Sequence, residues 1–415
     1  MQGEMSKQDK DKRVVIVGAG PVGMVCALAL NRSGIAVTVF EQEPAPVEDQ
    51  RAATIHPPTL EMLDALGVTQ KILPLGLVST TYRFHDRVNR AVVAEFDLDR
   101  MRDELKFPYV LQYEQYKLTA SIADEYANAG DFDVRFSHSV TGLRETADGV
   151  EIAYTSPDGA GRLAADYVIG CDGGRSTIRK LADIEFEGFT YPERFIKIAT
   201  SFDFGTVNSD LVLRNYFSDP DEWCNLFKVR GKRPPGLWRA IFPVSNDEPD
   251  EVALSPERIE ARLQKFFPKA GRYHVEYVNV YPVSQRVAAT FRKGRVLLAG
   301  DAAHVNNPIG GMGMNGGIHD GINLAGKLAR VIKGEAGEAG EALLDLYSRQ
   351  RHHAAVKYVQ AQTIANKKLM EERDPAVRAA KFDELRRIAD DPVASKAYMR
   401  RAALLDSLEM ASAVT

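Results

Sequence analysis

The sequence predicts an α/β fold in which a doubly wound, largely parallel sheet carries an inserted mixed β-sheet and is followed by a helical C-terminus. Three observations indicate this fold. A glycine-rich turn joins an apolar strand to a helix near the N-terminus, two later apolar strands end in Asp-Gly or Gly-Asp pairs, and alternating strands occupy much of the chain between them. Since 415 residues exceed the usual size of one domain, we expect a large insertion or a second domain.

The first element is the apolar strand Val14–Val17, which leads through the turn Gly18-x-Gly20-x-x-Gly23 into a helix. In such a turn the first glycine permits the tight bend, the second lets the backbone approach a pyrophosphate, and the third lets the helix pack on the strand. The unpaired N–H groups of the helix N-terminus attract phosphate. Glu41 ends the next apolar strand about 20 residues further on, where a carboxylate accepts hydrogen bonds from ribose hydroxyls. The segment therefore predicts a dinucleotide site.

The remaining elements follow in order along the chain. Apolar periodicity predicts helices, alternation predicts strands of an antiparallel meander, and a continuous apolar run predicts a buried strand. The expected ranges are a helix over 58–66, a helix over 114–129, meander strands over 134–136, 140–146 and 150–155, a buried strand over 167–171, a helix over 256–267 among the longer strands of 193–283, a buried strand over 295–301, and helices over 315–332 and beyond 341. Pro375 and Pro392 interrupt the last helical region.

These elements predict a discontinuous nucleotide-binding domain, an inserted sheet domain and a C-terminal helical segment. The predicted boundaries are 12–78, 106–182 and 284–340 for the nucleotide-binding domain, 79–105 and 183–283 for the inserted domain, and 341–415 for the C-terminal segment.

Composition narrows the classes of partner. The net charge of −4 gives no general attraction for nucleic acid, and no stretch is apolar and long enough to span a membrane, so neither is an expected partner. Residues 1–13 are charged and lack the apolar core of a secretory signal. Cys26, Cys171 and Cys224 lack the spacing of a disulfide framework or a metal site. We therefore expect a cytoplasmic protein without a metal ion.

Two further motifs follow buried strands. The strand of 167–171 continues as Cys171-Asp172-Gly173-Gly174-Arg175-Ser176-Thr177-Ile178-Arg179, and the strand of 295–301 continues as Gly300-Asp301-Ala302-Ala303-His304, with Pro308 behind it. Asp301 is expected at the C-terminal edge of the sheet, where doubly wound folds bind ligands. Together with the first turn, these motifs resemble those of the single-component FAD-dependent aromatic hydroxylases, flavoprotein monooxygenases typified by para-hydroxybenzoate hydroxylase.

The resemblance implies a Rossmann-like FAD-binding domain of the glutathione reductase type, with FAD as cofactor. The loop after Pro308 would bring glycine backbone against the flavin, and the helix behind it would direct its positive end to the pyrimidine ring. Arg51 is expected near the pyrophosphate and Asp172 near the approach of the nicotinamide, while Arg179 holds either Asp172 or the local loop. The implied FAD-binding residues are Gly18, Gly20, Pro21, Val22, Gly23, Glu41, Gln42, Arg51, Gln112, Asp172, Gly173, Arg179, Gly300, Asp301, Pro308, Gly311, Gly313, Met314 and Asn315.

The resemblance also implies the activity. NADH or NADPH would reduce the flavin, O2 would add to it as a flavin hydroperoxide, and one oxygen atom would pass to a phenolic or heteroaromatic ring, with or without a carboxylate. NADH is the expected reductant because residues 42–50 are acidic where a 2′-phosphate would need arginines. A small aromatic molecule and O2 are therefore the expected partners, and a homodimer is compatible with the sequence.

The inserted sheet is expected to cover the substrate. Period-two alternation places Tyr216, Asn225, Phe227 and Arg239 on one face, and Tyr216 resembles in placement a pocket tyrosine of the family. Tyr216 would bind the phenol oxygen, and Arg239 would bind a substrate carboxylate. The alternatives are a tyrosine packed in the sheet and an arginine that faces outward to a surface acid.

Three further residues are catalytic candidates. His56 and His85 would relay the substrate proton, and at each the alternative is a structural histidine. Pro308 lies in the loop expected beside the flavin. Two rival activities are a flavin-dependent halogenase or epoxidase of the same fold and a flavin-binding regulator without turnover. Residues 236–243 contain one tryptophan where the halogenase signature WxWxIP has two, which argues against the first.

Overall fold

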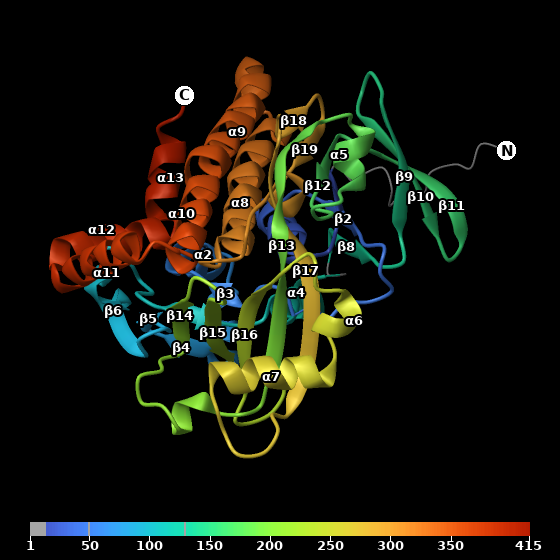
Figure 1. The fold of residues 1–415 in the computed structure, drawn as a ribbon. Coiled ribbons are helices and arrows are strands. Elements are labelled where there is room, and N and C mark those ends of the chain that lie inside the picture. The colour runs from blue at the N-terminus through green and yellow to red at the C-terminus, as the bar shows by residue number, and fades with distance from the viewer. Residues whose placement is uncertain (1–13, 49, 128–129) are drawn as a thin grey trace.

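The computed structural model describes residues 14–48, 50–127 and 130–415 and has the predicted α/β class with an inserted mixed sheet. Figure 1 shows the parallel sheet and its helices above the larger mixed sheet, with a meander projecting on one side and the C-terminal helices on the other. Within the described residues, no helix is both long and apolar enough to cross a membrane.

The parallel sheet forms around a fully buried central strand. β1 (Val14–Val17) pairs in parallel with β2 (Val37–Phe40) on one side and with β12 (Tyr167–Gly170) on the other. The chain leaves β1 toward β2 and returns to β12 on the opposite side, so the strand order reverses at the C-terminal end of β1, the place where doubly wound folds bind ligands. The strand order is β18 (Arg292–Lys293), β19 (Val296–Leu298), β12, β1, β2 and β8 (Phe132–Arg135).

One predicted strand pairs differently. The sequence assigns residues 134–136 to the antiparallel meander, whereas β8 pairs in parallel with β2. That assignment is wrong because the chain turns away after β8: Ser137 has a φ of 58°, and the N–H groups of Ser137 and His138 donate to carbonyls of the loop after β2. The meander instead consists of the antiparallel strands β9 (Ser139–Glu145), β10 (Val150–Ser156) and β11 (Gly159–Ala165).

The large mixed sheet has two distinct faces. Ile241 packs with Ile309 of the loop before α8, whereas its neighbour Phe242 packs with Leu263 of α7 (Pro256–Phe266). We call the first the inner face, toward the nucleotide-binding part, and the second the outer face, which α7 covers (Figure 1). The strand order is β20 (His304–Val305), β17 (Val275–Ala288), β13 (Phe186–Thr200), β16 (Leu237–Val244), β15 (Cys224–Val229), β14 (Arg214–Ser218), β5 (Thr81–Asp86) and β6 (Ala91–Asp97). The domain boundaries drawn from the sequence remain a prediction.

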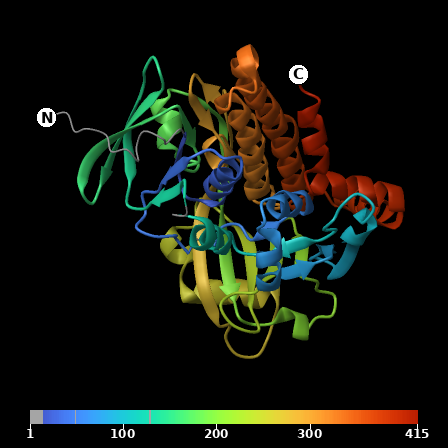
Figure 2. The same ribbon diagram turned by 180° about the vertical axis from the view of Figure 1, so that it is seen from behind.

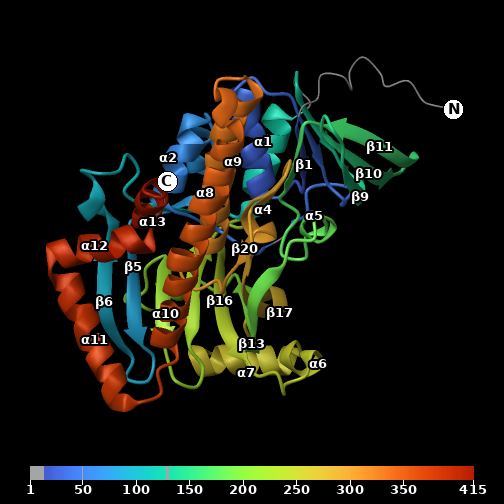
Figure 3. The ribbon, with the colours of Figure 1, turned by 90° about the horizontal axis from the view of Figure 1, so that it is seen from above.

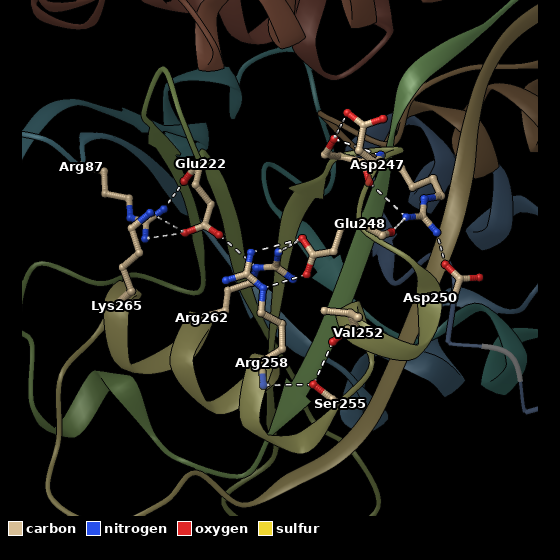
Figure 4. Close-up of polar contacts among 12 residues, drawn as sticks. Arg87, Glu222, Asp247, Glu248, Asp250, Val252, Ser255, Arg258, Arg262 and Lys265 are labelled. Carbon is tan, nitrogen blue, oxygen red and sulfur yellow. Dashed lines mark hydrogen bonds and ion pairs between the residues drawn. The ribbon is translucent and has the colours of Figure 1, made fainter.

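A buried ion-pair network fastens α7 to the outer face (Figure 4). Arg262 of α7 donates through Nε to Glu222 Oε1 at 3.0 Å, and its Nη2 lies 3.6 Å from Glu248 Oε2. Arg87, just after β5, donates to Glu222 Oε2 at 3.2 Å. A buried charge is stable only beside an opposite charge. These pairs therefore hold α7 against parts of the chain that are distant in sequence.

Prolines begin the two helices that cover the edge of the large sheet. α11 (Pro375–Asp390) and α12 (Pro392–Ala402) start at the prolines that interrupt the helical pattern, because proline suits the first helical position.

α8 (Met312–Ile332) begins earlier than the expected residue 315. The other elements are α1 (Pro21–Arg32), α2 (Pro57–Ala65), α3 (Thr69–Ile72), α4 (Gln115–Tyr126), α5 (Thr177–Leu181), α6 (Asp250–Ala253), α9 (Gly340–Ala354), α10 (Ala361–Met370), α13 (Leu405–Ser412), and the small sheet of β3 (Thr54–Ile55), β7 (Val110–Gln112) and β4 (Leu77–Ser79).

The meander and the C-terminal helices lie on opposite sides of the molecule. Seen from behind, the blue N-terminal elements stand between the meander and the red C-terminal helices (Figure 2). From above, α11 runs beside β6 at the edge of the large sheet (Figure 3). Tyr398 of α12 stacks on Phe96 of β6 with ring centroids 4.5 Å apart, so the C-terminal segment completes the packing of that edge.

Candidate active site

The turn after β1 permits close approach. Gly18 has a φ of 106°, and a Cβ there would lie 2.5 Å from the Cys171 carbonyl oxygen. A Cβ on Gly23 would lie 2.0 Å from the Gly18 carbonyl oxygen, so α1 packs this closely only with glycine at that position. A Cβ on Gly20 would meet no atom within 4 Å. The space beside Gly20 is therefore open to a ligand, and α1 begins without a side-chain cap on its N–H groups.

Glu41 braces this turn from the end of β2. Its Oε2 accepts from the Ala19 N–H at 2.8 Å, and its Oε1 accepts from the Glu43 N–H at 3.0 Å. Glu41 is half-buried and the neighbouring Gln42 is exposed. The carboxylate therefore holds two loops in place at the edge where a ribose is expected.

Asp172 caps the helix that follows it. Its carboxylate accepts from Ser176 Oγ at 2.5 Å and from the Thr177 N–H at 2.6 Å. Arg179 donates to the Gly174 carbonyl at 2.9 Å rather than to Asp172. The sequence leaves open whether Arg179 holds Asp172 or the local loop, and the structure shows that it binds the loop.

Arg179 also joins the two later motifs. Its Nη1 donates to the Ala302 carbonyl at 2.8 Å, and its guanidinium lies 3.7 Å from the centroid of the Phe186 ring. Since Ala302 follows Asp301 directly, this side chain fixes the loop after Asp172 against the Gly300-Asp301 turn. Asp301 itself is exposed at the C-terminal edge of the sheet.

A buried acid that the sequence analysis missed supports the Gly300-Asp301 turn. Asp320 of α8 is fully buried, and its Oδ2 accepts from the Gly300 N–H and from His304 Nε2, both at 3.0 Å. Its Oδ1 accepts from Arg351 Nε at 2.6 Å. Burial alone would raise the pKa of Asp320, but the charge of Arg351 and the His304 imidazole hold that pKa below its usual value. The available signal was an acid among the mostly apolar and glycine residues that α8 buries.

Asn315 ties the start of α8 to the chain near β3. Its Nδ2 donates to the carbonyls of Thr54 at 2.8 Å and Gly311 at 2.7 Å, and its Oδ1 accepts from the His56 N–H at 2.9 Å. Gln112, fully buried, accepts from Thr54 Oγ1 at 2.8 Å, but its Nε2 has no partner among the described residues. The Asn315 side chain is thus occupied within the protein, whereas Gln112 keeps a free donor.

A second network holds the loop before α8. Asn307 is fully buried; its N–H donates to Gln285 Oε1 at 2.9 Å and its Nδ2 to the Thr363 carbonyl at 2.9 Å. The Pro308 carbonyl accepts from the Gly311 N–H at 3.0 Å. Gly311, with a φ of 70°, precedes α8 and leaves its N–H groups without a side-chain cap. The loop is therefore fixed in place while the helix end stays available to a ligand.

These groups fit FAD. The open space beside Gly20 and the uncapped N-terminus of α1 suit a pyrophosphate, and the uncapped N-terminus of α8 suits the electron-rich end of a flavin. The unsatisfied Gln112 Nε2 is a buried donor that a bound ligand would satisfy. Arg51, by contrast, is exposed.

The four predicted substrate residues share the inner face of the large sheet. Tyr216 pairs with Asn225 across β14 and β15, and Phe227 pairs with Arg239 across β15 and β16, so alternation brings all four to one side. Tyr216 stacks on Phe84 with centroids 5.1 Å apart.

Arg239 reaches toward the loop that precedes Arg51. Its Nη1 donates to the Gln50 carbonyl at 3.2 Å, and the buried Lys197 donates to the same carbonyl. Arg239 is 1% exposed. The outward-facing alternative is therefore wrong, and the side chain links the inserted sheet to the nucleotide-binding part.

The two candidate histidines lie on different sides of the sheet. His56 is buried beside Gly311, near the backbone of Gly310 and Ala403, and its ring nitrogens make no hydrogen bond of normal geometry with a described residue. Burial, and then the positive charge of Arg214, lower the pKa of His56 to about 3, so its ring is neutral at neutral pH.

His85 lies on the outer face. Its ring stacks on Phe217 at 4.3 Å and its Nε2 lies 3.1 Å from Asn215 Oδ1. Burial lowers the pKa of His85 as well. The sheet therefore separates His85 from Tyr216. Across the described ranges, no group of three or more His, Cys, Asp or Glu side chains is arranged to hold a metal ion.

Comparisons with known proteins agree with this geometry. The model of the FAD binding domain family matches residues 11–362. The para-nitrophenol 4-monooxygenase of Pseudomonas sp. (strain WBC-3) is 32% identical over 398 residues, which span 94% of this chain and 93% of that protein. A 3-(3-hydroxy-phenyl)propionate/3-hydroxycinnamic acid hydroxylase of Mycolicibacterium smegmatis is 33% identical over 375 residues, 88% of this chain and 64% of the longer relative.

Solved structures show the same likeness in three dimensions. The crystal structure of p-nitrophenol 4-monooxygenase from Pseudomonas putida DLL-E4 superimposes with a TM-score of 0.88 at 31% identity, covering 96% of this chain and 98% of the other. Aklavinone-11 hydroxylase, solved with FAD and aklavinone, superimposes with a TM-score of 0.75 at 26% identity, covering 87% and 69%. From the family match, the shared fold and the three assembled motifs, the chain belongs to the single-component FAD-dependent aromatic hydroxylases.

Proposed function

We propose that this aromatic hydroxylase acts on a small phenol or hydroxylated heteroaromatic ring and takes its electrons from NADH in preference to NADPH. The observation that carries the proposal is the convergence of the Gly18, Asp172 and Gly300 motifs at one sheet edge, next to an inserted sheet whose inner face presents Tyr216 and Asn225. The relative that this chain matches over 93% of its length is named for para-nitrophenol, which supports a single-ring phenol. Cytoplasmic location and a homodimer remain proposals from the sequence.

The positions of these residues support a role for each in binding FAD. The α1 N-terminus and the Gly20 backbone would hold the pyrophosphate, Glu41 the ribose and Asp301 the ribityl chain. Gln112 Nε2 would satisfy its missing hydrogen bond on the same ligand. When bound, FAD accepts hydride from the nicotinamide and activates O2 for transfer to the ring.

The protein's own part in the reaction is to orient the ring and exclude water. The inner face offers Tyr216, Asn225 and Phe227 to the substrate, and Pro308 and Gly311 present the fixed loop on the opposite side. His56, neutral because of its burial, can donate or accept a hydrogen bond there but is a weak base at neutral pH. His85, behind the sheet, has no part in this proposal.

Adding candidate substrates to the purified enzyme tests the proposal. Hydroxybenzoates, hydroxypyridines and 4-nitrophenol should include at least one compound that raises the initial rate of NADH oxidation and yields a product heavier by one oxygen. A stimulated rate without any hydroxylated product would contradict it.

Substituting Asp301→Ala is expected to lower the FAD content of the purified protein and raise the dissociation constant for FAD about tenfold or more, since one charged hydrogen bond contributes about 1.5–3 kcal/mol. Absorbance at the flavin band, relative to protein, measures the content. Asp383→Ala, at an exposed position of α11, is the matched control and should keep full FAD. Full occupancy in Asp301→Ala would remove this residue from the proposed site.

The initial rate with NADH is expected to exceed the rate with NADPH. Residues 42–48 include Glu43 and Glu48 and no arginine, so a 2′-phosphate near this loop would meet negative charge. Comparing kcat/KM for the two reductants at a saturating concentration of the same phenol checks the preference. A strong preference for NADPH would refute it.

A further inference from the structure

A closed set of hydrogen bonds surrounds Asn307 in the loop of residues 306–311. Asn307 is 0% exposed. Its N–H donates to Gln285 Oε1 and its Nδ2 to the Thr363 carbonyl, both at 2.9 Å. Its Oδ1 accepts from the Ile309 N–H at 3.1 Å. Gln285 Nε2 in turn donates to Thr363 Oγ1 at 2.8 Å. We call Gln285, Asn307 and Thr363 the Asn307 network.

The Asn307 network joins parts of the protein that are separate in the fold. Gln285 lies on β17 of the large sheet, Asn307 lies in the loop before α8, and Thr363 lies on α10 of the C-terminal segment. Gln285 is 2% exposed and Thr363 is 0% exposed. A buried polar group that loses its partner is costly, so the network favours one arrangement of the sheet, the loop and the helix.

Two more side chains of the C-terminal segment hold the same loop. Asn366 of α10 donates through Nδ2 to the Ile309 carbonyl at 3.1 Å. Gln360 donates through Nε2 to the Val305 carbonyl, directly before the loop, at 3.1 Å. Gln360 ends a π-helical turn, Ala355–Gln360, that joins α9 to α10. Such turns are rare in proteins and frequently lie at functional sites.

These contacts fix Ile309 through both of its backbone groups. Its N–H donates to Asn307 and its carbonyl accepts from Asn366, while its side chain belongs to the same apolar cluster as Val283 of β17. Since the loop would face the flavin and the large sheet would cover the substrate, the contacts set the distance between these two ligands. Rates depend steeply on such distances, because a misplacement of about 1 Å can cost about a hundredfold.

We propose that Gln285, Asn307 and Thr363 are positioning residues that hold the flavin loop against the large sheet, and so decide whether oxygen reaches the ring. The inference rests on the proposed function and assigns to it residues outside the ligand site. In the complete reaction, NADH, a proton and O2 convert the ring compound to its hydroxylated product, NAD+ and water. When the ring is out of reach, the same electron pair and two protons reduce O2 to hydrogen peroxide.

The ratio of hydroxylated product to hydrogen peroxide tests the proposal in the FAD-loaded enzyme, with NADH and the phenol that it hydroxylates fastest. The variants are Gln285→Met, Thr363→Val and Thr363→Ser. Gln350→Met is the matched control. Gln350 is a 6% exposed glutamine of α9 that accepts from Lys327 Nζ at 2.8 Å and donates to the Val414 carbonyl at 3.2 Å, away from the loop.

We expect Gln285→Met to lower the ratio about tenfold or more, because the Asn307 N–H loses its acceptor and the loop shifts. Thr363→Val keeps the shape of the side chain without the hydroxyl and should lower the ratio less. Thr363→Ser keeps the hydroxyl and should retain the wild-type ratio, as should Gln350→Met. A merely structural defect reduces the amount of folded enzyme and lowers both products together, so it leaves the ratio unchanged.

Amide hydrogen exchange of the FAD-loaded enzyme, without NADH or phenol, gives a readout that does not depend on turnover. The N–H groups of Asn307 and Ile309 should exchange faster in Gln285→Met than in the wild type. The first loses its acceptor, and the second depends on Asn307 staying in place. In Gln350→Met both groups should exchange as they do in the wild type.

The outcomes separate this inference from the proposed function. A wild-type ratio in Gln285→Met and Thr363→Val, an equal fall in Gln350→Met, or unchanged exchange at Asn307 and Ile309 would overturn the inference and leave the proposed function intact. A wild type that hydroxylates none of the phenols would overturn both. Thr363→Val carries the same comparison if Gln285→Met loses FAD.

Discussion

Replacing Arg351 by methionine is expected to lower the free energy of unfolding by about 3–5 kcal/mol, because the change leaves the Asp320 carboxylate buried without its cation. The two side chains are 2% and 0% exposed and are joined by a 2.6 Å hydrogen bond. FAD content should fall as well, since Asp320 accepts the Gly300 N–H at the turn that carries Asp301. Urea-induced unfolding of the FAD-loaded protein measures the first effect, and flavin absorbance measures the second.

Arg386→Met is the control for this experiment. Arg386 pairs with Asp383 one turn away on α11, and both side chains are largely exposed, so its loss should change the free energy of unfolding by less than about 1 kcal/mol. If Arg351→Met destabilised the protein no more than Arg386→Met does, the buried pair would not be what holds the Gly300 turn.

Gly23→Ala is expected to cost about 1–3 kcal/mol of stability and most of the bound FAD. The new Cβ would lie 2.0 Å from the Gly18 carbonyl oxygen, so α1 must move away from the turn that receives the pyrophosphate. Thermal unfolding and FAD content of the purified variant give the two readouts.

Gly326→Ala provides the matched comparison within a helix. A Cβ at this position of α8 would meet no atom within 4 Å, so alanine should stabilise the helix by about 0.5–1 kcal/mol. Normal FAD content in Gly23→Ala would show that the close contact between α1 and the turn is not needed for the cofactor.

The nucleotide-binding part could be predicted because its signals are local. The apolar run of β1 and the glycines after it act within a few residues, and Glu41 lies at the spacing that such a turn predicts; the structure places them together at the strand-order reversal. The helix predicted over 256–267 is observed as α7, which ends one residue earlier. Its start could be predicted because Ser255 caps it and Pro256 is its first residue. Such features depend on propensity and capping rather than on distant packing.

What the sequence could not supply depends on distant contacts and on register. Asp320 gains its role from Arg351 and His304, which lie far from it in sequence. The outer placement of His85 follows from the register of β5: Phe84 pairs with Tyr216 and His85 with Phe217, so alternation puts His85 on the face opposite Tyr216.

The most direct test of the account is hydroxylation in isotopically labelled O2. The FAD-loaded enzyme is supplied with NADH, labelled O2 and whichever phenol stimulates NADH oxidation most, and the products are examined by mass spectrometry. The account predicts a ring product that carries one labelled oxygen atom, formed in proportion to the NADH consumed. NADH oxidation that yields hydrogen peroxide alone, or a product whose new oxygen comes from water, would contradict it.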